Sequence, residues 1–347
     1  MTPDSSTPPP FDTGGATSTG SDRGVVRGGS ISDADAAWFA QRFTDVVRNV
    51  LTVIRGKDSQ VWLALVAMVA EGHILIEDVP GVGKTTLARV LASSIGGSVT
   101  RIQFTPDLLP SDVTGVSIWN QKSQTFEFKP GPVFTNICVG DEINRASPKT
   151  QSALLEVMEE GQVTVEGHPL PVPQPFIVIA TQNPIELDGT YSLPEAQLDR
   201  FLIRMSMGYP DAAAESVIVA DRRVHNRESV RPVASLEEVQ RMVDIAARVH
   251  VAAEVVDYCV AIATATRHSP DVRLGSSPRG SLGLARAAQA LAASEARTFV
   301  TPDDVKRLAI PVLAHRLLVA PDAALRGVTA QRIIEDALES VSTSSAV

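Results

Sequence analysis

The 347-residue chain has few of the features that mark secreted, metal-binding or membrane proteins. Its two cysteines, Cys138 and Cys259, are too few for a disulfide framework or a four-cysteine metal site, and its six histidines are scattered without ligand spacing. We therefore expect both cysteines to be packing residues. No apolar run reaches the ~18 residues of a membrane span, and the longest, 61–70, is typical of a buried helix. The N-terminus shows no secretory signal, which predicts a cytoplasmic protein.

Positive charge is also scarce. A formal net charge of −9 argues against a general nucleic-acid binder, because such proteins need a concentrated positive surface. The basic cluster at 222–227 is short and lacks aromatic residues for base stacking, so it is more consistent with a solvated face or an interdomain hinge.

Composition divides the chain into four segments. Residues 1–30 are rich in Pro, Gly, Ser and Thr, which predicts a disordered tail. Residues 31–210 show buried-strand and helix patterns and predict an α/β core domain. Residues 211–341 are alanine-rich without strand signals, which predicts a separate helical domain, and 342–347 form a short tail. The helices expected there cover 212–224, 235–249, 253–266, 280–293, 302–317 and 329–341, with Asp211, Ala234 and Thr301 at the cap positions of the first, second and fifth.

Two β-hairpins are predicted within the core domain. The first joins 116–119 to 125–128 through a polar turn. The second joins 163–165 to 170–172 across Glu166-Gly167-His168, where nearby prolines restrict pairing to a sheet edge.

A glycine-rich loop lies where a strand turns into a helix. Gly81 and Gly83 allow backbone N–H groups to close around a phosphate, and the following helix points its positive end at that anion. Lys84 is expected to reach the β- and γ-phosphates, and the Thr85 hydroxyl to bind Mg²⁺. Asp78 occupies the place where the full P-loop pattern has glycine. A simple turn that ends a strand is the alternative interpretation of this loop.

Two acids follow the apolar run 136–140. A buried parallel strand has this pattern, and ligands of parallel sheets bind at the carboxyl ends of the strands. We expect Asp141 to hold Mg²⁺, directly or through water, and Glu142 to polarise the water that attacks the γ-phosphate. Two acids that merely cap a strand are the alternative.

Three further side chains are candidates for contact with the nucleotide. Asn183 follows the apolar run 176–181 and can hydrogen-bond the γ-phosphate or the attacking water. Arg200, near the end of a short helix, is either a structural ion pair or an arginine finger for a neighbouring subunit. Arg279 opens a helix of the second domain and can pair with phosphates if that domain closes on the nucleotide.

With these features in order, the chain resembles the AAA+ ATPases, and specifically the MoxR family, over about residues 32–340. The most specific motifs are Gln103 to Asp112, Asp141 to Ala146, Ala180 to Pro184, Leu193 to Phe201 and Ser277-Pro278-Arg279. Asp78 in place of glycine is usual for this family.

The resemblance implies roles for the candidate residues. Asp141 and Glu142 correspond to Walker B, Asn183 to sensor 1, Arg200 to the arginine finger and Arg279 to sensor 2. The residues of the Walker A loop, which bind ATP, are Pro80, Gly81, Val82, Gly83, Lys84, Thr85 and Thr86.

The resemblance also implies an architecture and a class of work. It implies an αβα core with a five-stranded parallel sheet and two hairpin inserts, a helical lid, and a ring that is usually hexameric. ATP and Mg²⁺ are the implied cofactors. Chaperone-like assembly or activation of other proteins is the implied function, often with a von Willebrand factor A-domain partner. A nucleotide-gated adaptor with little turnover and a DNA- or chelatase-type remodeller stay open as alternatives.

Overall fold

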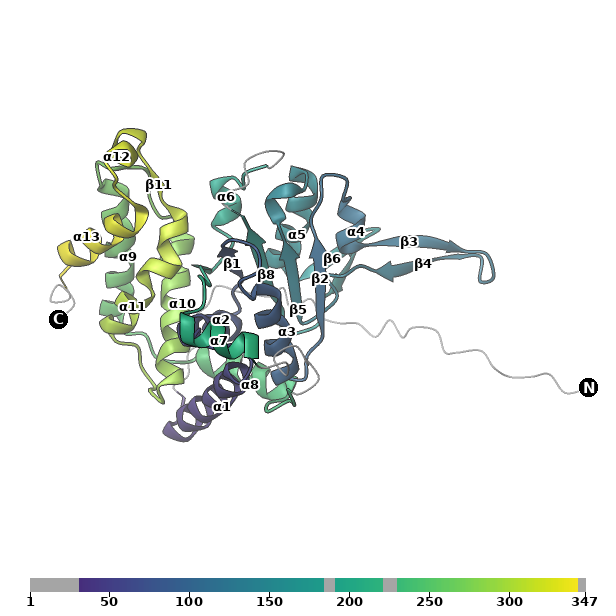
Figure 1. Ribbon diagram of the computed structural model, residues 1–347, viewed down its shortest axis with the longest axis horizontal. Coiled ribbons are helices and arrows are strands. Elements are labelled where there is room, and N and C mark those ends of the chain that lie inside the picture. Colours follow the sequence, from purple (N-terminus) through teal and green to yellow (C-terminus); the bar gives the residue numbers. More distant parts are fainter. Residues whose placement is uncertain (1–30, 184–190, 221–229, 343–347) are drawn as a thin grey trace, which may run out of the picture.

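A five-stranded parallel sheet forms the centre of the molecule (Figure 1). In the computed structural model the described residues are 31–183, 191–220 and 230–342, so the predicted N-terminal tail and the basic cluster at 222–227 lie outside them. The strand order is β2-β5-β8-β1-β9, and every neighbouring pair is parallel, which confirms the predicted sheet. The strands are β1 (Ile74–Glu77), β2 (Val99–Gln103), β5 (Ile137–Asp141), β8 (Ile177–Gln182) and β9 (Ile203–Met205).

Alternate residues of these strands enter two separate hydrophobic clusters, one on each face of the sheet. Ile74 and Ile76 pack with one set of helices, whereas Leu75 between them packs with the other, as the two-residue period of a strand requires. The first set comprises α1 (Asp33–Leu51), α2 (Asp58–Val69) and α3 (Lys84–Ser94). The second comprises α4 (Pro110–Thr114), the 3₁₀ turn η1 (Ile143–Arg145), α5 (Pro148–Glu160) and α6 (Glu195–Leu198). This sandwich is the expected αβα core.

Both predicted hairpins are present. The first, β3 (Gly115–Asn120) with β4 (Thr125–Pro130), projects from the body of the core (Figure 1). The second pairs β6 (Gln162–Val165) with β7 (His168–Pro171). Its turn is tighter than predicted, because Glu166 and Gly167 both adopt positive φ angles, of 51° and 82°. Two such residues close a hairpin by themselves, so His168 already belongs to the strand.

The remaining helices follow β9 along the chain. They are α7 (Ala212–Ala220), α8 (Leu236–Ala246), α9 (Ala253–His268), α10 (Pro278–Ser294), α11 (Pro302–Leu313), η4 (Ala314–Arg316), α12 (Pro321–Leu325) and α13 (Ala330–Ser340). The expectation of helices alone missed a small antiparallel pair, β10 (Val272–Leu274) with β11 (Leu318–Val319). These strands are too short to give a periodic pattern.

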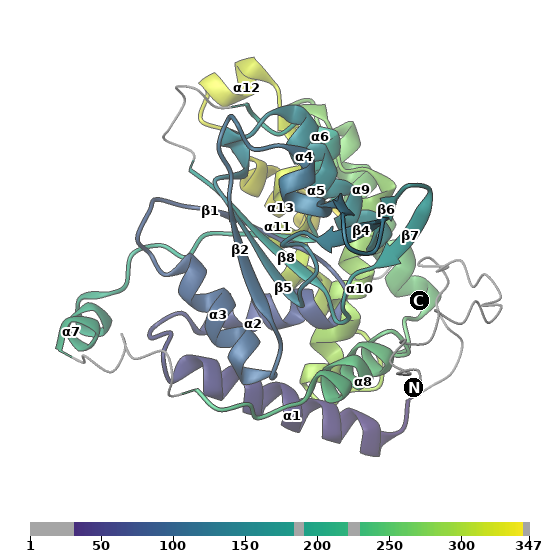
Figure 2. The same ribbon diagram turned by 90° about the vertical axis from the view of Figure 1, so that its right-hand side faces the viewer.

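Capping residues set several helix starts in this part of the chain. Ser235, not the predicted Ala234, caps α8, and its side chain and that of Glu238 form a capping box. Thr301 caps α11 as expected, in a capping box with Asp304. In Figure 2, α7 stands apart from the sheet, while α8 lies beside α1.

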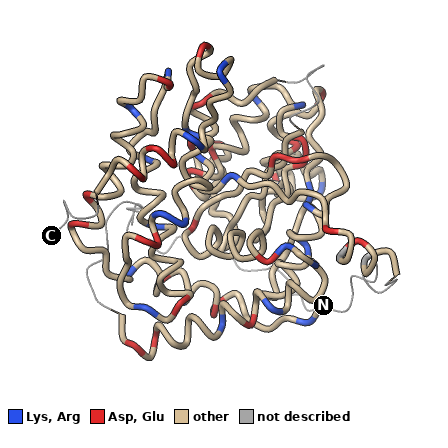
Figure 3. Tube along the Cα trace, turned by 60° about the vertical axis from the view of Figure 1, so that its left-hand side comes forward, with Lys and Arg blue, Asp and Glu red and all other residues tan. Residues whose placement is uncertain are grey.

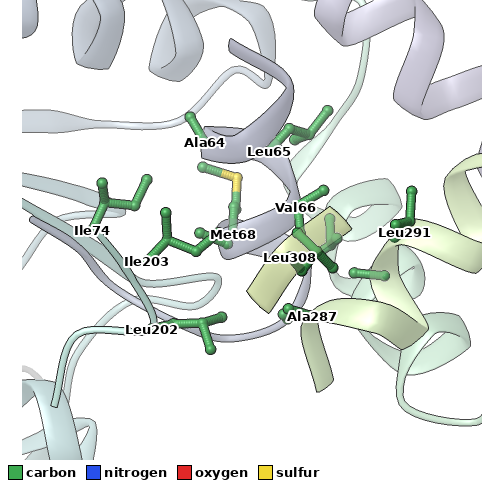
Figure 4. Close-up of a cluster of buried hydrophobic side chains, with 14 of the residues drawn as sticks. Ala64, Leu65, Val66, Met68, Ile74, Leu202, Ile203, Ala287, Leu291 and Leu308 are labelled. Atoms are coloured by element: carbon green, nitrogen blue, oxygen red, sulfur yellow. The ribbon is translucent and has the colours of Figure 1, made fainter. Parts of the chain in front are cut away.

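The second group of helices packs directly on the first. Leu65 of α2 and Leu202, the residue before β9, meet Ala287, Leu291 and Leu308 from α10 and α11 in one continuous cluster (Figure 4). Each such buried leucine contributes roughly 1.5–3 kcal/mol to folding. The apolar run at 61–70 is a buried helix, as predicted, and within the described residues no helix is long and apolar enough to cross a membrane. Cys138 and Cys259 are buried and free, and burial raises the pKa of each to about 12.

Candidate functional site

The glycine loop connects β1 to α3 at the carboxyl edge of the sheet. Gly81 and Gly83 have φ angles of +88° and +94°, a region that other residues rarely adopt. A Cβ atom at either position would meet no atom within 4 Å, so open space lies in front of the loop. Helix α3 begins directly after Gly83, and its unpaired N–H groups face the same end. The loop therefore has the geometry of an anion-binding site.

Lys84 is the first residue of α3 and folds back over the loop. Its Nζ donates to the Asp78 carbonyl oxygen at 2.7 Å. Burial lowers the pKa of Lys84, while the nearby carboxylates of Asp141, Asp78 and Glu142 oppose this shift without cancelling it. The Lys84 ammonium group thus lies near three acids at this edge of the sheet.

Asp78, where the P-loop pattern has glycine, has its own structural role. Its carboxylate accepts hydrogen bonds from Ser206 Oγ at 2.8 Å, from the Gly208 N–H at 2.6 Å and from the Val79 N–H at 2.9 Å. Burial acts to raise the pKa of Asp78, but these hydrogen bonds outweigh it and hold the pKa below its usual value. Asp78 therefore fastens the loop to the chain that leaves β9.

Asp141 ends β5 and is held by two neighbouring strands. Thr181 Oγ1 on β8 donates to Asp141 Oδ1 at 2.6 Å. Arg101 on β2 pairs with Oδ2 at 2.6 Å. Strand pairing sets both contacts, because Gln103 lies opposite Asp141 and Ala180 opposite Gly140. The carboxylate is thereby fixed next to Lys84.

Glu142 adopts a left-handed backbone conformation with φ 57° and ψ 50°. This region is uncommon for residues other than glycine and is often found at active sites. The Glu142 N–H donates to Thr181 Oγ1 at 3.0 Å, so the same hydroxyl positions both acids. Its Oε2 atom accepts from Gln103 Nε2 at 2.9 Å and pairs with Arg145 Nε at 2.8 Å.

Asn183 and the threonines of α3 complete this edge. Asn183 is buried and follows β8, which lies between β1 and β5. The Asp78 N–H donates to the Gln182 carbonyl at 3.2 Å, which places Asn183 next to the start of the loop. Thr85 and Thr86 lie in the first turn of α3 and are half-buried, as Val82 is, while Pro80 is exposed. The sequence-predicted Walker A and Walker B residues and Asn183 are therefore brought together.

Arg200 and Arg279 lie at the other edge of the sheet. The Leu202 N–H donates to the carbonyl of His73, the residue before β1, and His73 Nε2 lies 2.9 Å from the Met158 carbonyl oxygen. The end of α5 and the segment before β9 are therefore at the amino edge. From His73 to Asp78 the chain advances ~17 Å at the usual strand rise.

Both arginines bind one carboxylate there. Arg200 Nη2 pairs with Glu159 Oε2 at 2.9 Å, and Arg279 Nη2 pairs with Glu159 Oε1. The sequence predicts that Arg279 can pair with phosphates if the helical domain closes on the nucleotide; here the start of α10, with Arg279, packs at the amino edge. Arg200 makes an ion pair, one of the two interpretations left open by the sequence.

A buried network joins this pair of arginines to the helical region. Arg316 Nε donates to Asp199 Oδ1 at 2.8 Å, with its side chain only 3% exposed. Ser277 Oγ, which caps α10, donates to Asp199 Oδ2 at 2.7 Å. His315 Nε2 lies 2.8 Å from the Phe201 carbonyl oxygen, and burial lowers the pKa of this histidine well below 6.5.

Comparison with known proteins agrees with this geometry. The pattern of the ATPase family associated with various cellular activities (AAA) matches residues 73–203, and that of an AAA lid domain matches 264–337. The chain is 50% identical to the uncharacterized protein YeaC of Bacillus subtilis, over 85% of this chain and 92% of YeaC. It is 41% identical to Chaperone MoxR1 of Mycobacterium tuberculosis, over 84% of this chain and 80% of MoxR1. The chain belongs to the MoxR family of AAA ATPases.

A solved structure supports the same assignment. The crystal structure of a candidate ATPase from Cytophaga hutchinsonii has a TM-score of 0.83 and 35% identity, covering 89% of this chain and 97% of that one. Membership of this ATPase family implies that the MoxR-family chain binds and hydrolyses ATP.

Several residues of this MoxR-family site escaped the sequence analysis. Thr181, Arg101 and Gln103 position the acids, and Glu159 and Asp199 hold the arginines. Thr181 could have been identified from the sequence, because a hydroxyl at the end of an apolar strand and close to Asn183 is expected to lie at the same edge of the sheet. Glu159 gave none, since it resembles any exposed residue of a helix.

Proposed function

We propose that this MoxR-family ATPase is a ring-forming remodeller that uses ATP hydrolysis to assemble, mature or activate partner proteins. The observation that carries the proposal is the split between the two edges of the sheet. Lys84 and the acids lie at one edge, whereas Arg200 and Arg279 lie at the other, beyond the reach of an arginine side chain. A second copy of the chain that presents its amino edge to this loop would complete the site.

The loop and the start of α3 are assigned to the ATP phosphates. Backbone N–H groups around Gly81 and Gly83 cradle the phosphate chain, with Pro80 and Val82 shaping the loop and Thr86 following in the first turn. Lys84 supplies the positive charge for the β- and γ-phosphates.

Thr85 and Asp141 are assigned to Mg²⁺. Magnesium in nucleotide sites uses one or two protein ligands, with phosphate oxygens and waters supplying the rest. In the described parts of the chain no group of three or more His, Cys, Asp and Glu side chains gathers as a metal site, and a nucleotide-dependent ion needs none. One hydroxyl and one carboxylate beside the loop fit such an ion. When bound, Mg²⁺ offsets charge on the phosphates.

Glu142 is assigned to the attacking water. Its described contacts with Gln103 and Arg145 both use Oε2, so we assign Oε1 to the water. The water oxygen bonds to the γ-phosphorus, the bond to the β–γ bridging oxygen breaks, and the water gives up its proton to Glu142 as ADP and phosphate form. Asn183 orients the γ-phosphate or this water.

Arg200 and Arg279 are assigned to the neighbouring subunit's nucleotide. Charge develops on the transferred phosphoryl group and its leaving oxygen, and a guanidinium from the next subunit stabilises it. A ring, with six subunits as the family suggests, gives every site such a neighbour.

The projecting hairpin supports protein partners over nucleic acid. Ile118, Trp119 and Phe126 on β3 and β4 are 49%, 46% and 65% exposed. Basic residues there are limited to Lys122 and Lys129, so phosphate contacts would be few. In Figure 3 positive and negative residues are interspersed along the trace. The name of the relative MoxR1 also favours chaperone-like work, and a von Willebrand factor A-domain protein is a suitable first partner to test.

Glu142→Gln tests the assignment. Loss of the base should lower kcat by ~10²–10⁴-fold while ATP binding by calorimetry stays close to wild type. The matched control is Glu127→Gln on the exposed hairpin, which should hydrolyse ATP normally. Undiminished turnover in Glu142→Gln would refute the role of Glu142.

The same variant separates a remodeller from an adaptor. A remodeller that stalls with ATP bound should retain a von Willebrand factor A-domain partner longer with ATP than with ADP. A wild-type protein that binds this partner in ATP but shows negligible turnover would favour the nucleotide-gated adaptor. Equal retention with ATP, ADP and no nucleotide would count against both.

A further inference from the structure

One carboxylate at the end of α5 holds both arginines of the amino edge. Glu159 Oε2 pairs with Arg200 at 2.9 Å, and Oε1 pairs with Arg279. Arg200 Nη1 also donates to the Leu155 carbonyl at 2.7 Å, one turn earlier on the same helix. The core arginine and the lid arginine are therefore fixed relative to each other through Glu159.

The backbones that carry the two arginines are joined as well. Asp199, next to Arg200, accepts from Ser277, which caps the helix on which Arg279 lies. The buried Arg316 pairs with the other oxygen of Asp199 and donates to the Phe201 carbonyl at 2.7 Å. These contacts set where the two side chains start, while Glu159 sets where the guanidinium groups end.

The charges explain why a carboxylate is needed between them. Two guanidinium groups repel one another, and without an acid between them they would separate into solvent. Each guanidinium has five N–H donors. Glu159 and Leu155 engage only part of this set, so donors remain for an incoming phosphate.

The surroundings leave both arginines accessible. A cavity of about 470 Å³ beside Arg200 is lined by Ser152, Gln162 and Gln197 and by three carboxylates, Glu156, Glu159 and Glu160, while Arg279 lies outside it. The side chains of Arg200 and Arg279 are 30% and 48% exposed, so both can be reached from outside the chain.

We infer that Glu159 is a positioning residue for ATP hydrolysis, which holds Arg200 and Arg279 at the spacing needed to contact the nucleotide of the neighbouring subunit together. This inference rests on the proposed function, in which the arginines act on the next subunit. Glu159 itself touches no reacting atom in this arrangement.

Glu159→Gln tests the inference with a side chain of the same size. Misplacement of a catalytic group by about 1 Å can cost up to ~10²-fold in rate, so we expect kcat to fall about tenfold. KM for ATP should stay near the wild-type value, because the P-loop is untouched. Glu254→Gln is the matched control, since Glu254 is an exposed glutamate of α9 that does not line this cavity. Its kcat should equal that of wild type.

Mixing two impaired variants distinguishes positioning from a merely structural role. Subunits with Glu159→Gln keep an intact loop edge, and subunits with Glu142→Gln keep an intact arginine edge. Where the loop of a Glu159→Gln subunit faces the arginines of a Glu142→Gln subunit, a whole site forms. The ATPase activity of the mixture should therefore exceed the average activity of the two separate preparations several-fold. A structural defect within each Glu159→Gln subunit would not be rescued in this way.

A parallel mixture of Arg200→Ala with Glu142→Gln tests the proposed function by itself. If that mixture gains activity while the Glu159→Gln mixture does not, the role of Glu159 is overturned and the shared site stands. If neither mixture gains activity, the shared site fails and the inference fails with it. A kcat of Glu159→Gln at or above wild type would also overturn the inference, because it would show that Glu159 is dispensable or restrains the arginines.

Discussion

The carboxyl and amino edges of the sheet carry the two parts of the candidate site in different ways. At the carboxyl edge, loops that directly follow β1, β5 and β8 supply the functional groups, and strand pairing brings them together. At the amino edge, Arg200 and Arg279 come from segments 79 positions apart in the numbering and meet on Glu159. The first edge is organised by its own strands, and the second by contacts between the core and the helical region.

The difference shows what each edge needs for activity. In the proposed function, the loop edge supplies the groups for binding ATP and activating water within one chain. The arginine edge has cations that Glu159 already holds, and in the proposed function their remaining donors act only when a phosphate from outside the chain reaches them. We expect ATP binding to depend on the first edge and turnover to depend on both.

Removing Arg200 should have the largest effect. Arginine fingers contribute ~10³–10⁵-fold to kcat in other phosphoryl-transfer systems, so Arg200→Ala should lose at least ~10³-fold with ATP binding retained. Steady-state hydrolysis and nucleotide titration measure the two quantities separately. Arg273→Ala, an exposed arginine of β10, is the control and should behave as wild type.

Dilution sharpens the same comparison without a mutation. If edges from two different subunits form the site, the ATPase activity per subunit of the wild type should rise with protein concentration. The activity per subunit of Arg200→Ala should not change with concentration. Equal specific activity in dilute monomer and in assembled protein would remove Arg200 from its proposed role.

Asp78→Asn should weaken the loop edge by a smaller amount. The amide keeps the size of the side chain but has only one oxygen. That oxygen can accept either from Gly208 and Ser206, which share Oδ2, or from the Val79 N–H on Oδ1, so one set of donors faces an NH₂ group. Leaving a buried polar group unsatisfied costs roughly 1–3 kcal/mol, so the free energy of unfolding should fall by about that amount. Denaturant unfolding measures it, with the exposed Asp257→Asn as control. Unchanged stability and unchanged KM for ATP would mean that the loop is held by other contacts.

The smallest expected effect is on the pH dependence of the free energy of unfolding, which should differ between groups at the two edges. The pKa of His315 is lowered in the folded protein, so the unfolded chain binds a proton near pH 6.5 that the folded chain does not. Stability therefore falls as pH drops through this range, by at most ~1.4 kcal/mol per pH unit for one proton.

Asp78, at the carboxyl edge, affects the free energy of unfolding in a different pH range. Its pKa is lowered too, but for an acid this contributes stability above its ordinary value of 3.8, which is lost only as pH falls further. Denaturant unfolding between pH 7.5 and 5.5 should therefore report His315, and His315→Gln should reduce the slope. An equal slope in the variant would assign the pH dependence to other groups.

The sequence predicted the loop edge well, for a physical reason. A phosphate loop, a strand that ends in two acids and an amide after the next strand are each local patterns, and a parallel sheet collects them at one edge. The sequence alone therefore predicts that Gly81, Lys84, Asp141 and Asn183 lie together.

The amino edge could not be predicted in the same way. Glu159 is one of several acids on α5, and only the packing of α10 against the core brings Arg279 to it. The interaction of Asp199 with Arg316 spans 117 positions and has no periodic signal. The sequence predicts contact between Arg279 and phosphates only if the helical domain closes on the nucleotide, and it carries no signal for the packing that brings Arg279 to Glu159.

The contacts of Asp78 have a mechanical consequence. Through Ser206 and Gly208 this carboxylate ties the phosphate loop to the strand end from which the chain continues into α7. We expect a displacement of the loop to move the chain after β9 as well, because short hydrogen bonds connect the two segments directly. An aspartate where other P-loops have glycine thus restricts the movement of the loop and couples the proposed nucleotide site rigidly to the chain that follows β9.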